Sequence, residues 1–330
     1  MASATQVSSV PVLPITAGNN CKFKFVGEGA ANFVFEVLVP PSDEPRDNPC
    51  NLLRVPKAGT KAHSHVELQE YWKTVVAPLF EPDHLVQHQL VKLGDEGLVS
   101  RLNAVLDEEE HTRRSDFKGS RVALAEYGML VEDMRQKFKP KWLAQSPNAP
   151  SSATRCRNCA REALKHHTKP ASHRKPNHAV LCPLNFLTCS TSPPALANIL
   201  THLFADEPPT PSQVAQRNRL IHWLQTNTLL PRLRAAQESN DRNGPLGASA
   251  EDRQFQLAMT LRDCTCFVRI PADPALPVEA KLADLDKKNS VAKLGYWQAM
   301  ERELIDGGYY EGREVPLVRT DCQLEKGVVT

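Results

Sequence analysis

Short apolar runs separated by polar stretches fill the first part of the chain, and this pattern is typical of β-strands joined by loops. Runs rich in phenylalanine and valine at 22–26 and 33–39 precede a third run at 52–57. The spacing of apolar residues over 65–76 predicts a helix. The continuous apolar run 122–131 predicts a buried strand. The first part of the chain is therefore expected to be rich in β-structure.

Further along the chain, the apolar positions follow a helical period. Helices are predicted over residues 155–167, 194–204, 211–230 and 250–261, with a terminal helix from Val291 to the Gly307-Gly308 pair. A polar loop is expected at 237–250, and a β-rich run at 262–270 follows the fourth helix. This order predicts an α+β protein in which a larger mixed portion follows a β-rich one.

A stretch of small residues joins the first two predicted strands. It consists of Gly27, Glu28, Gly29, Ala30, Ala31 and Asn32. Small side chains let backbone N–H groups approach an anion such as a nucleotide phosphate, but a tight hairpin turn needs the same residues, and on spacing alone the hairpin is favoured. No Lys-Ser/Thr pair follows, so this is not a Walker A loop. In the next strand either Arg54 or Lys57 is available to phosphates; otherwise they form an ordinary exposed strand end.

A basic segment begins near the middle of the chain. From Arg135 to Lys175 there are eleven Lys or Arg residues against one acidic residue. Pro140 favours an extended conformation for Lys139, so Lys137, Lys139 and Lys141 are expected on one face of a strand. Their ammonium groups repel each other unless an anion lies between them. The simpler alternative is a solvated basic loop.

Composition restricts the kind of anion. The net charge of the 330 residues is only +2, so the basic segment is local, and it favours a compact, highly charged anion over a nucleic-acid backbone. Nine cysteines without disulfide-framework spacing indicate a reducing environment. The absence of a secretory signal and of a long apolar run predicts a soluble intracellular protein.

Two cysteines at Cys156-x-x-Cys159, with histidines and Cys182 nearby, suggest a zinc site. No second Cys-x-x-Cys pair or finger-type histidine pair completes the pattern, so buried cysteines on a helix face are the favoured interpretation. The same predicted helix makes Arg155, Arg161 and Lys165 available to an anion.

Acidic residues near the end of the chain complete a set of groups for phosphoryl transfer. Asp284 and Asp286 are expected on one side of an extended segment, where hard carboxylate oxygens suit Mg²⁺. Asp263, beside a predicted strand, is placed to accept a proton from an attacking hydroxyl. Positioning and charge neutralisation are what phosphoryl transfer requires.

Several short motifs occur in one order: Gly27 to Asn32, Lys139-Pro140-Lys141, Arg155 with Lys165, Asp263-Cys264 and Asp284-Leu285-Asp286. From about residue 22 to Tyr310 the chain resembles the inositol-pentakisphosphate 2-kinase family in its fungal form. The resemblance implies transfer of the ATP γ-phosphate to the 2-hydroxyl of inositol 1,3,4,5,6-pentakisphosphate, giving the hexakisphosphate (phytate). It implies a two-lobed kinase-like fold, with a flexible N-terminus (1–20), an ATP-binding N-lobe (21–134) and a C-lobe for the inositide and magnesium (135–330).

The resemblance also assigns roles to individual residues. ATP phosphates would contact the glycine loop and Arg54, and adenine would lie at a crossover of Glu132, Asp133 and Met134. The inositide would be bound by Lys139, Lys141, Arg155, Lys165, Lys288 and Tyr296. Asp263 would act on the 2-hydroxyl, and Asp284 would bind magnesium with Asp286 beside it.

The chain departs from the family pattern in two places. Lys137 stands where the family motif has Glu, and only four residues separate Met134 from Lys139, a shorter connection than is usual. Ala292 stands where the family has a further cation, with Lys293 adjacent. The alternatives are therefore a degenerate member that binds inositide or RNA without catalysis, and a zinc-containing nucleic-acid module. The main interpretation predicts a monomer in the nucleus or cytoplasm with no nucleic-acid or membrane partner.

Overall fold

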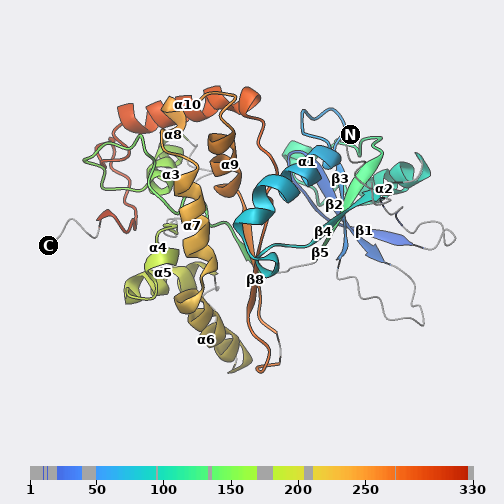
Figure 1. Cartoon of the computed structure of the whole chain (residues 1–330), viewed down its shortest axis with the longest axis horizontal. Helices are drawn as coiled ribbons and strands as arrows, with labels where there is room; N and C mark the ends of the chain where they lie inside the picture. Colours follow the sequence, from blue (N-terminus) through green and yellow to red (C-terminus); the bar gives the residue numbers. More distant parts are fainter. Residues whose placement is uncertain are drawn as a thin grey trace, which may run out of the picture. The chain divides into compact units, whose positions relative to one another are not determined.

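The chain forms two compact units. The computed structural model describes residues 10, 13, 21–38, 50–93, 96–132, 136–168, 181–203, 211–271 and 273–325. The first unit comprises Met1–Thr74 and Val86–Met134, and the second comprises Val75–Leu85 and Arg135–Thr330. Each unit contains helices and an antiparallel sheet, so the predicted α+β class is confirmed (Figure 1). The predicted N-lobe and C-lobe are functional divisions and stay a prediction. The segment Val75–Leu85, which falls within the predicted N-lobe, belongs to the second unit.

The first unit is built on a five-stranded antiparallel sheet of order β1-β2-β3-β5-β4. Its strands are β1 (Lys22–Glu28), β2 (Asn32–Leu38), β3 (Cys50–Pro56), β4 (His88–Lys92) and β5 (Tyr127–Glu132). The strands β1 and β2 form the expected hairpin around the glycine stretch. The predicted strand 122–131 is shorter in the structure and begins at Tyr127. Sequence analysis did not predict β4.

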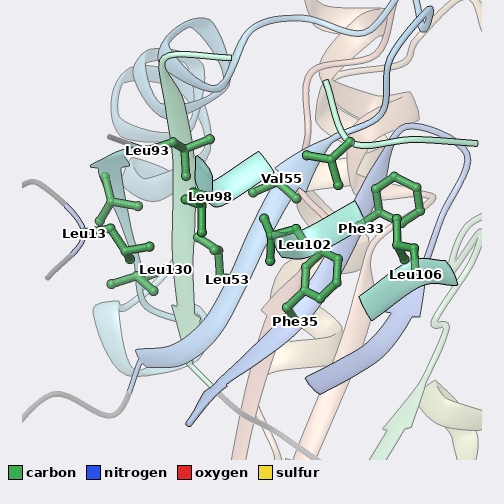
Figure 2. Close-up of a cluster of buried hydrophobic side chains, with 12 residues drawn as sticks. Leu13, Phe33, Phe35, Leu53, Val55, Leu93, Leu98, Leu102, Leu106 and Leu130 are labelled. Atoms are coloured by element: carbon green, nitrogen blue, oxygen red, sulfur yellow. The ribbon is translucent and has the colours of Figure 1, made fainter. Parts of the chain in front are cut away.

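One face of this sheet is covered by α2 (Glu96–Glu108), which sequence analysis also missed. Alternating residues such as Phe33 and Phe35 on β2 are fully buried. Residues four apart on α2, namely Leu98, Leu102 and Leu106, pack onto them, as Figure 2 shows. This cluster is the core of the first unit.

The N-terminal stretch is not frayed throughout. Leu13 is 2% exposed within the core of the first unit, and its N–H donates to the carbonyl of Lys92 at 3.0 Å. Apart from Val10, the rest of the predicted flexible stretch 1–20 lies outside the described residues. At Leu13 the expectation of a flexible end is therefore wrong.

The first predicted helix begins at an N-terminal cap. Ser64 and Glu67 form a reciprocal capping box, with the Ser64 N–H donating to the Glu67 carboxylate at 2.9 Å. The helix α1 (His65–Tyr71) continues as a π-helical turn, Trp72–Val76, and then a 3-10 turn, Ala77–Leu79. The predicted helical stretch over 65–76 is confirmed. Further 3-10 turns cover Pro82–His84 and Ser115–Phe117.

The second unit surrounds a three-stranded antiparallel sheet of order β6-β7-β8. Its strands are β6 (Gln136–Phe138), β7 (Thr265–Arg269) and β8 (Glu279–Ala283). Its helices are α3 (Arg157–Thr168), α4 (Asn185–Thr188), α5 (Pro193–Leu203), α6 (Pro211–Thr226), α7 (Leu229–Ser239), α8 (Gly244–Gly247), α9 (Arg253–Leu261) and α10 (Ser290–Asp306). The terminal helix α10 packs against α8 and α3 (Figure 1).

Most predicted helices of the second unit are confirmed, with one change of boundary. The predicted helix 211–230 is two helices, because the chain leaves the helical path after Thr226 and α7 starts at Leu229. The helix α7 runs into the predicted polar loop and ends at Ser239. No helix among the described residues has both the length and the apolar character that crossing a bilayer requires.

Candidate functional site

Three charged residues meet at one end of the sheet in the second unit. Lys139 directly follows β6, Asp263 lies two residues before β7, and Asp284 directly follows β8. Because β7 is antiparallel to both neighbours, the start of β7 lies beside the ends of β6 and β8, and the strand register confirms this. The fold thus brings together three residues that are far apart in the sequence.

Lysine and aspartate side chains make direct contacts there. The Nζ atom of Lys139 lies 3.0 Å from the carbonyl oxygen of Asp263, 3.5 Å from its Oδ1, and 4.0 Å from Oδ2 of Asp284. The Nζ atom of Lys288 lies 2.6 Å from Oδ2 of Asp263. The hydroxyl of Thr265 donates to Oδ2 of Asp284 at 2.6 Å. Asp263 and Asp284 are therefore held by partners on neighbouring segments.

The backbone is unusual at two of these positions. Lys141 has a φ of 58° and Asp284 a φ of 57°, and they are the non-glycine residues with positive φ in the described part of the chain. Left-handed backbone costs of order 1 kcal/mol or more for such residues and is concentrated at functional sites. The strand β8 ends at Ala283 and the backbone of Asp284 is left-handed, so strand alternation no longer supports the expectation that Asp284 and Asp286 share one side of an extended segment, which stays a prediction. Alternation likewise stops before Lys141.

A cavity of about 360 Å³ lies next to Asp263. Its cationic lining residues are Lys141, Arg157, Arg161, Arg262, Lys288 and Lys293. Its other lining residues include Asn158, Asp263, Tyr296 and Trp297. A space of this size with six cationic residues and one acidic residue in its lining suits a small, multiply charged anion.

The local charges shift two pKa values. Burial lowers the pKa of Lys141, and Lys139, Arg161 and Lys165 lower it further, although Asp263 opposes them. Burial raises the pKa of Asp263, but Lys288, Lys139 and Lys141 outweigh it, so the pKa of that carboxyl lies below its ordinary value. Asp263 is therefore ionised at neutral pH, and Lys141 lies in an environment short of negative charge.

One buried side chain ties the lysine segment to the segment that carries Asp263. The amide of Gln237, on α7, is fully buried. Its Nε2 donates to the carbonyls of Lys141 at 2.9 Å and Leu261 at 3.2 Å, and its Oε1 accepts from the N–H of Leu143 at 2.9 Å. Leu261 is the last residue of α9, two residues before Asp263. Gln237 therefore fixes the backbone on both sides of the cavity.

A second set of charged groups surrounds Trp142, and two of its members, Arg157 and Arg262, also line the cavity. The guanidinium carbons of Arg157 and Arg262 lie 4.0 and 3.5 Å from the centroid of its ring. Arg157 pairs with Glu301 at 2.6 Å, and Arg262 pairs with Asp241. All of these side chains are buried, and each cation has its own carboxylate. This group was not anticipated from the sequence.

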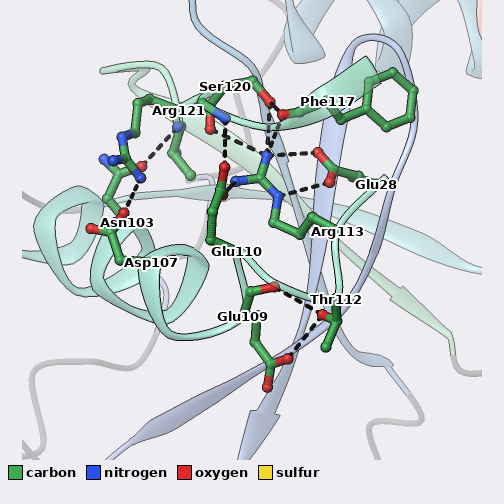
Figure 3. A network of polar contacts seen from close by, with 12 residues as sticks. Glu28, Asn103, Asp107, Glu109, Glu110, Thr112, Arg113, Phe117, Ser120 and Arg121 are labelled. Atoms are coloured by element: carbon green, nitrogen blue, oxygen red, sulfur yellow. Dashed lines mark hydrogen bonds and ion pairs between the residues drawn. The ribbon is translucent and has the colours of Figure 1, made fainter. Parts of the chain in front are cut away.

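In the first unit, the glycine stretch has open space around it. A Cβ atom placed on Gly27 or Gly29 would meet no heavy atom within 4 Å. Glu28, by contrast, turns away into a buried network, shown in Figure 3. It pairs with Arg113 at 2.9 Å and with Lys57 at 2.6 Å. Lys57, considered above as a phosphate ligand, is thus already engaged by a carboxylate.

The remaining residues proposed for ATP are only partly described. Arg54 lies on β3, where it pairs with Met129 and Val34 in the strand register. Glu132 ends β5 and is buried, with its carboxylate accepting from the N–H of Gln87 at 3.2 Å. Asp133 and Met134 lie outside the described residues. The adenine crossover therefore stays a prediction.

Comparison with known proteins identifies the family. The sequence model of the family described as inositol-pentakisphosphate 2-kinase matches residues 25–303. The chain belongs to the inositol-pentakisphosphate 2-kinase family. A protein of Yarrowia lipolytica named inositol-pentakisphosphate 2-kinase is 28% identical over 305 residues, which cover 88% of this chain and 93% of the relative. The protein is thus a kinase of inositol phosphate metabolism, and membership of this family implies use of ATP and of an inositol phosphate substrate.

Not every residue expected to bind the inositide reaches the cavity. Arg155 is 2% exposed, and its guanidinium pairs with Glu314 and Glu325, both at 2.7 Å. The structure places it in the interior because the C-terminal segment supplies these carboxylates. Lys165 pairs with Glu162 at 2.5 Å on the same helix. In this inositol-pentakisphosphate 2-kinase fold, Lys139, Lys141, Lys288 and Tyr296 are brought together, whereas Arg155 is not.

Three cavity residues come from α3, namely Arg157, Asn158 and Arg161. Asn158 and Arg161 are three positions apart and share a helix face with Lys165. Helical spacing in a basic segment was the signal for Arg161, which sequence analysis named as available to an anion without assigning it a role. Nothing in the sequence pointed to Asn158.

Four cysteine side chains cluster elsewhere in the second unit. The Sγ atoms of Cys156, Cys159, Cys182 and Cys322 all lie within 4.8 Å of one another, and all four residues are buried. All four thiols are free. The helix-face interpretation accounts for Cys156 and Cys159 but does not account for their convergence with Cys182 and Cys322. His167, by contrast, bonds Tyr309 and Pro316 and is not part of the cluster.

Proposed function

We propose that this kinase transfers the γ-phosphate of ATP to the 2-hydroxyl of inositol 1,3,4,5,6-pentakisphosphate, giving the hexakisphosphate. The observation that carries the proposal is the cavity beside Asp263, in which Lys141, Arg161, Lys288 and Lys293 are grouped. Five phosphate groups on one small ring demand many converging cations, and lysine and arginine supply them. A degenerate binding protein would need the cations but not the adjacent carboxylates.

In this mechanism Asp263 accepts a hydrogen bond from the 2-hydroxyl and takes its proton as the oxygen attacks the γ-phosphorus. A new P–O bond forms, the bond to the β-phosphate oxygen breaks, and ADP leaves. The lowered pKa of Asp263 makes it a weak base, so it acts mainly by orienting the hydroxyl. Lys139 and Lys288, which contact Asp263, hold that carboxylate in place. The lysines also offset the charge of the substrate phosphates.

Magnesium fits the carboxylates beside this site. Asp284 is 59% exposed at the side chain, and Thr265 orients its carboxylate, so oxygen atoms of the kind Mg²⁺ prefers are accessible. Asp284 would hold the ion, with Asp286 beside it, where the hydroxyl of Thr260 donates to the backbone carbonyl of Asp286. When bound, the ion would neutralise charge on the phosphates.

For ATP, the proposal uses the hairpin of the first unit. Gly27 and Gly29 leave free space above their backbone, which lets N–H groups approach phosphates closely. Arg54 and the residues Ala30 to Asn32 would contact the same phosphates. Glu28 would contribute through the fold of the loop, because Arg113 and Lys57 already occupy its carboxylate.

The test is an assay of purified protein with ATP, magnesium and inositol pentakisphosphate, with products resolved by phosphate number. The wild type should form the hexakisphosphate. Asp263→Ala should lower kcat by roughly 100-fold or more while inositide binding persists. Asp306→Ala, an exposed acid at the end of α10, is the matched control and should behave as wild type. Normal turnover by Asp263→Ala would show the mechanism to be wrong.

We further propose that the cysteine cluster binds a structural zinc ion. Zinc–sulfur bonds of about 2.3 Å in a tetrahedron place sulfur atoms about 3.8 Å apart. The Sγ atom of Cys182 lies 3.8 Å from that of Cys156 and 3.9 Å from that of Cys322. The N–H of Cys156 also donates to Sγ of Cys322 at 3.2 Å, a contact that stabilises a thiolate ligand. Four sulfur ligands leave no open position, so the ion would be structural.

Elemental analysis of protein purified under reducing conditions tests this proposal. About one zinc ion per chain is expected, and Cys322→Ser should lose zinc and lower Tm. Cys21→Ser, outside the cluster, should do neither. Zinc-free wild-type protein whose Tm is unchanged by Cys322→Ser would refute the proposal. The proposed kinase function does not depend on the outcome of this zinc analysis. That the protein is a monomer in the nucleus or cytoplasm stays a prediction.

A further inference from the structure

Arg161 is the cavity cation whose surroundings differ most from those of the other arginines nearby. It lies on α3, which also presents Arg157 and Asn158 to the cavity. Arg155 and Arg157 on the same stretch, and Arg262 on the facing segment, each pair with a carboxylate. Arg161 has no carboxylate partner among the described ion pairs. Its charge therefore lacks a counterpart within the described part of the protein.

The hydrogen bonds of Arg161 are also incomplete. Its Nη2 donates to the hydroxyl of Tyr296, on α10, at 3.3 Å. Its Nε is buried and has no hydrogen-bond partner among the described residues, which is also true of Nε of Arg262, whose charge is however matched by Asp241. A guanidinium has five N–H donors, and leaving a buried one unsatisfied is unfavourable. The simpler alternative, a solvated surface arginine, would leave Nε accessible to water.

Positive charge around Arg161 makes its position more costly without an anion. Lys141, Lys288 and Lys293 line the same cavity, and Asp263 is the acidic residue among the lining residues. The charge of Arg161 contributes to lowering the pKa of Lys141. A phosphate dianion in the cavity would supply the missing charge and would accept hydrogen bonds from the guanidinium N–H groups of Arg161 that face the cavity.

We propose that Arg161 is a substrate-binding residue whose guanidinium binds a phosphate of the inositol polyphosphate, and that Tyr296 is a positioning residue that holds the guanidinium. This inference rests on the proposed kinase function and deepens it. Planar guanidinium groups bind phosphate oxygens through two parallel hydrogen bonds, which an ammonium group does not match. Tyr296 thereby acts through Arg161, instead of contacting the inositide itself as the family resemblance implied.

The experiment measures the Kd of inositol pentakisphosphate by calorimetry without ATP, and kcat and both KM values in the assay above. The variants are Arg161→Gln, Arg161→Lys, Tyr296→Phe and the double variant Arg161→Gln with Tyr296→Phe. Arg302→Gln, an exposed arginine on α10 that does not line the cavity, is the matched control. Tm is recorded for every variant, so that a loss of folding is recognised.

We expect Arg161→Gln to raise the inositide Kd roughly 10- to 100-fold, because a charge-assisted hydrogen bond is lost. The KM for ATP should stay at the wild-type value. Arg161→Lys should recover only part of the affinity. Tyr296→Phe should raise Kd roughly two- to tenfold alone and should add nothing in the double variant.

Two results would overturn the inference. Arg161→Gln with wild-type Kd and KM would remove Arg161 from the binding site. If Tyr296→Phe raises the inositide Kd by the same factor with and without Arg161→Gln, then Tyr296 contacts the inositide independently of Arg161. Both results require wild-type protein that binds and phosphorylates the inositide. If the wild type does neither, the proposed kinase function fails instead.

Discussion

Two charged regions of the second unit lie next to each other in sequence and differ in how their charges are matched. Around Trp142, Arg157 pairs with Glu301, and Arg262 pairs with Asp241, all in the interior. In the adjoining cavity, lysines and Arg161 outnumber the acidic side chains, and several groups are exposed. The charges of the buried region are matched without a ligand, although Nε of Arg262 has no hydrogen-bond partner among the described residues, whereas the charges of the cavity are not matched. Matched buried charges thus indicate a structural role, and unmatched accessible charges indicate binding.

The two regions share their backbone. Trp142 follows Lys141, and Arg262 precedes Asp263, so each buried residue neighbours a residue of the cavity. Glu301 has three described partners, accepting from Ser146 and Tyr310 as well as from Arg157. The buried network therefore fixes the segments from which the cavity side chains extend. Rigid support of this kind is what pre-organised binding sites require.

The largest effect expected from this comparison is on folding. Glu301→Ala leaves the buried guanidinium of Arg157 without its carboxylate, so the free energy of unfolding should fall by about 3–5 kcal/mol. Unfolding in denaturant measures this free energy for the wild type and the variant. Glu303→Ala, an exposed acid on the same helix, should change stability by less than about 0.5 kcal/mol. Equal effects of the two substitutions would remove the distinction between the two regions.

A double substitution of the lysines beside Asp263 should affect binding and not folding, the opposite of Glu301→Ala. Lys139→Met with Lys141→Met should weaken inositide binding by roughly 100-fold or more, because two charge-assisted contacts are lost. The free energy of unfolding should not fall, since repulsion between these lysines is relieved. Calorimetric binding and denaturant unfolding on the same protein check both expectations. A large loss of stability would mean that the lysines serve the fold.

The smallest effect expected is a pH dependence of stability. The pKa of Lys141 in the folded protein lies below its ordinary value. The folded state therefore binds a proton at this residue less tightly than the unfolded state does, and the protonated lysine destabilises the unliganded protein at neutral pH. Lys141→Met should therefore be slightly more stable than wild type, by on the order of 0.5 kcal/mol. The difference should shrink as pH rises towards 10.5, where the unfolded lysine also loses its proton. Lys118→Met, an exposed lysine of the first unit, should show no such trend.

Sequence reasoning located the parts of the site that depend on strand ends. Asp263 and Lys139 were recognisable because each stands next to a short β-rich run, and antiparallel pairing then brings them together. The helices of the second unit were predictable from their period. The strand β4 was missed because it is short, and α2 because it follows an unassigned stretch. The site contacts themselves depend on long-range packing, which periodicity does not encode.

Some features left no local signal. Cys322 joins Cys156 and Cys159 only through the path of the C-terminal segment, so spacing rules could not include it. The same path supplies Glu314 and Glu325, which draw Arg155 inward and away from the anion site. A left-handed backbone is unexpected at Lys141, whereas aspartate, as at Asp284, adopts this conformation more readily. Each of these depends on tertiary structure.

The buried amide of Gln237 limits how far Lys141 and Asp263 can move apart. Its single amide bonds the backbone beside Lys141 and the end of the helix that leads to Asp263. Thermal motion that separated these two segments would have to break hydrogen bonds made by a fully buried side chain. The distance between Lys141 and Asp263, the proposed phosphate ligand and the proposed proton acceptor, is thus set by a neutral and fully buried side chain.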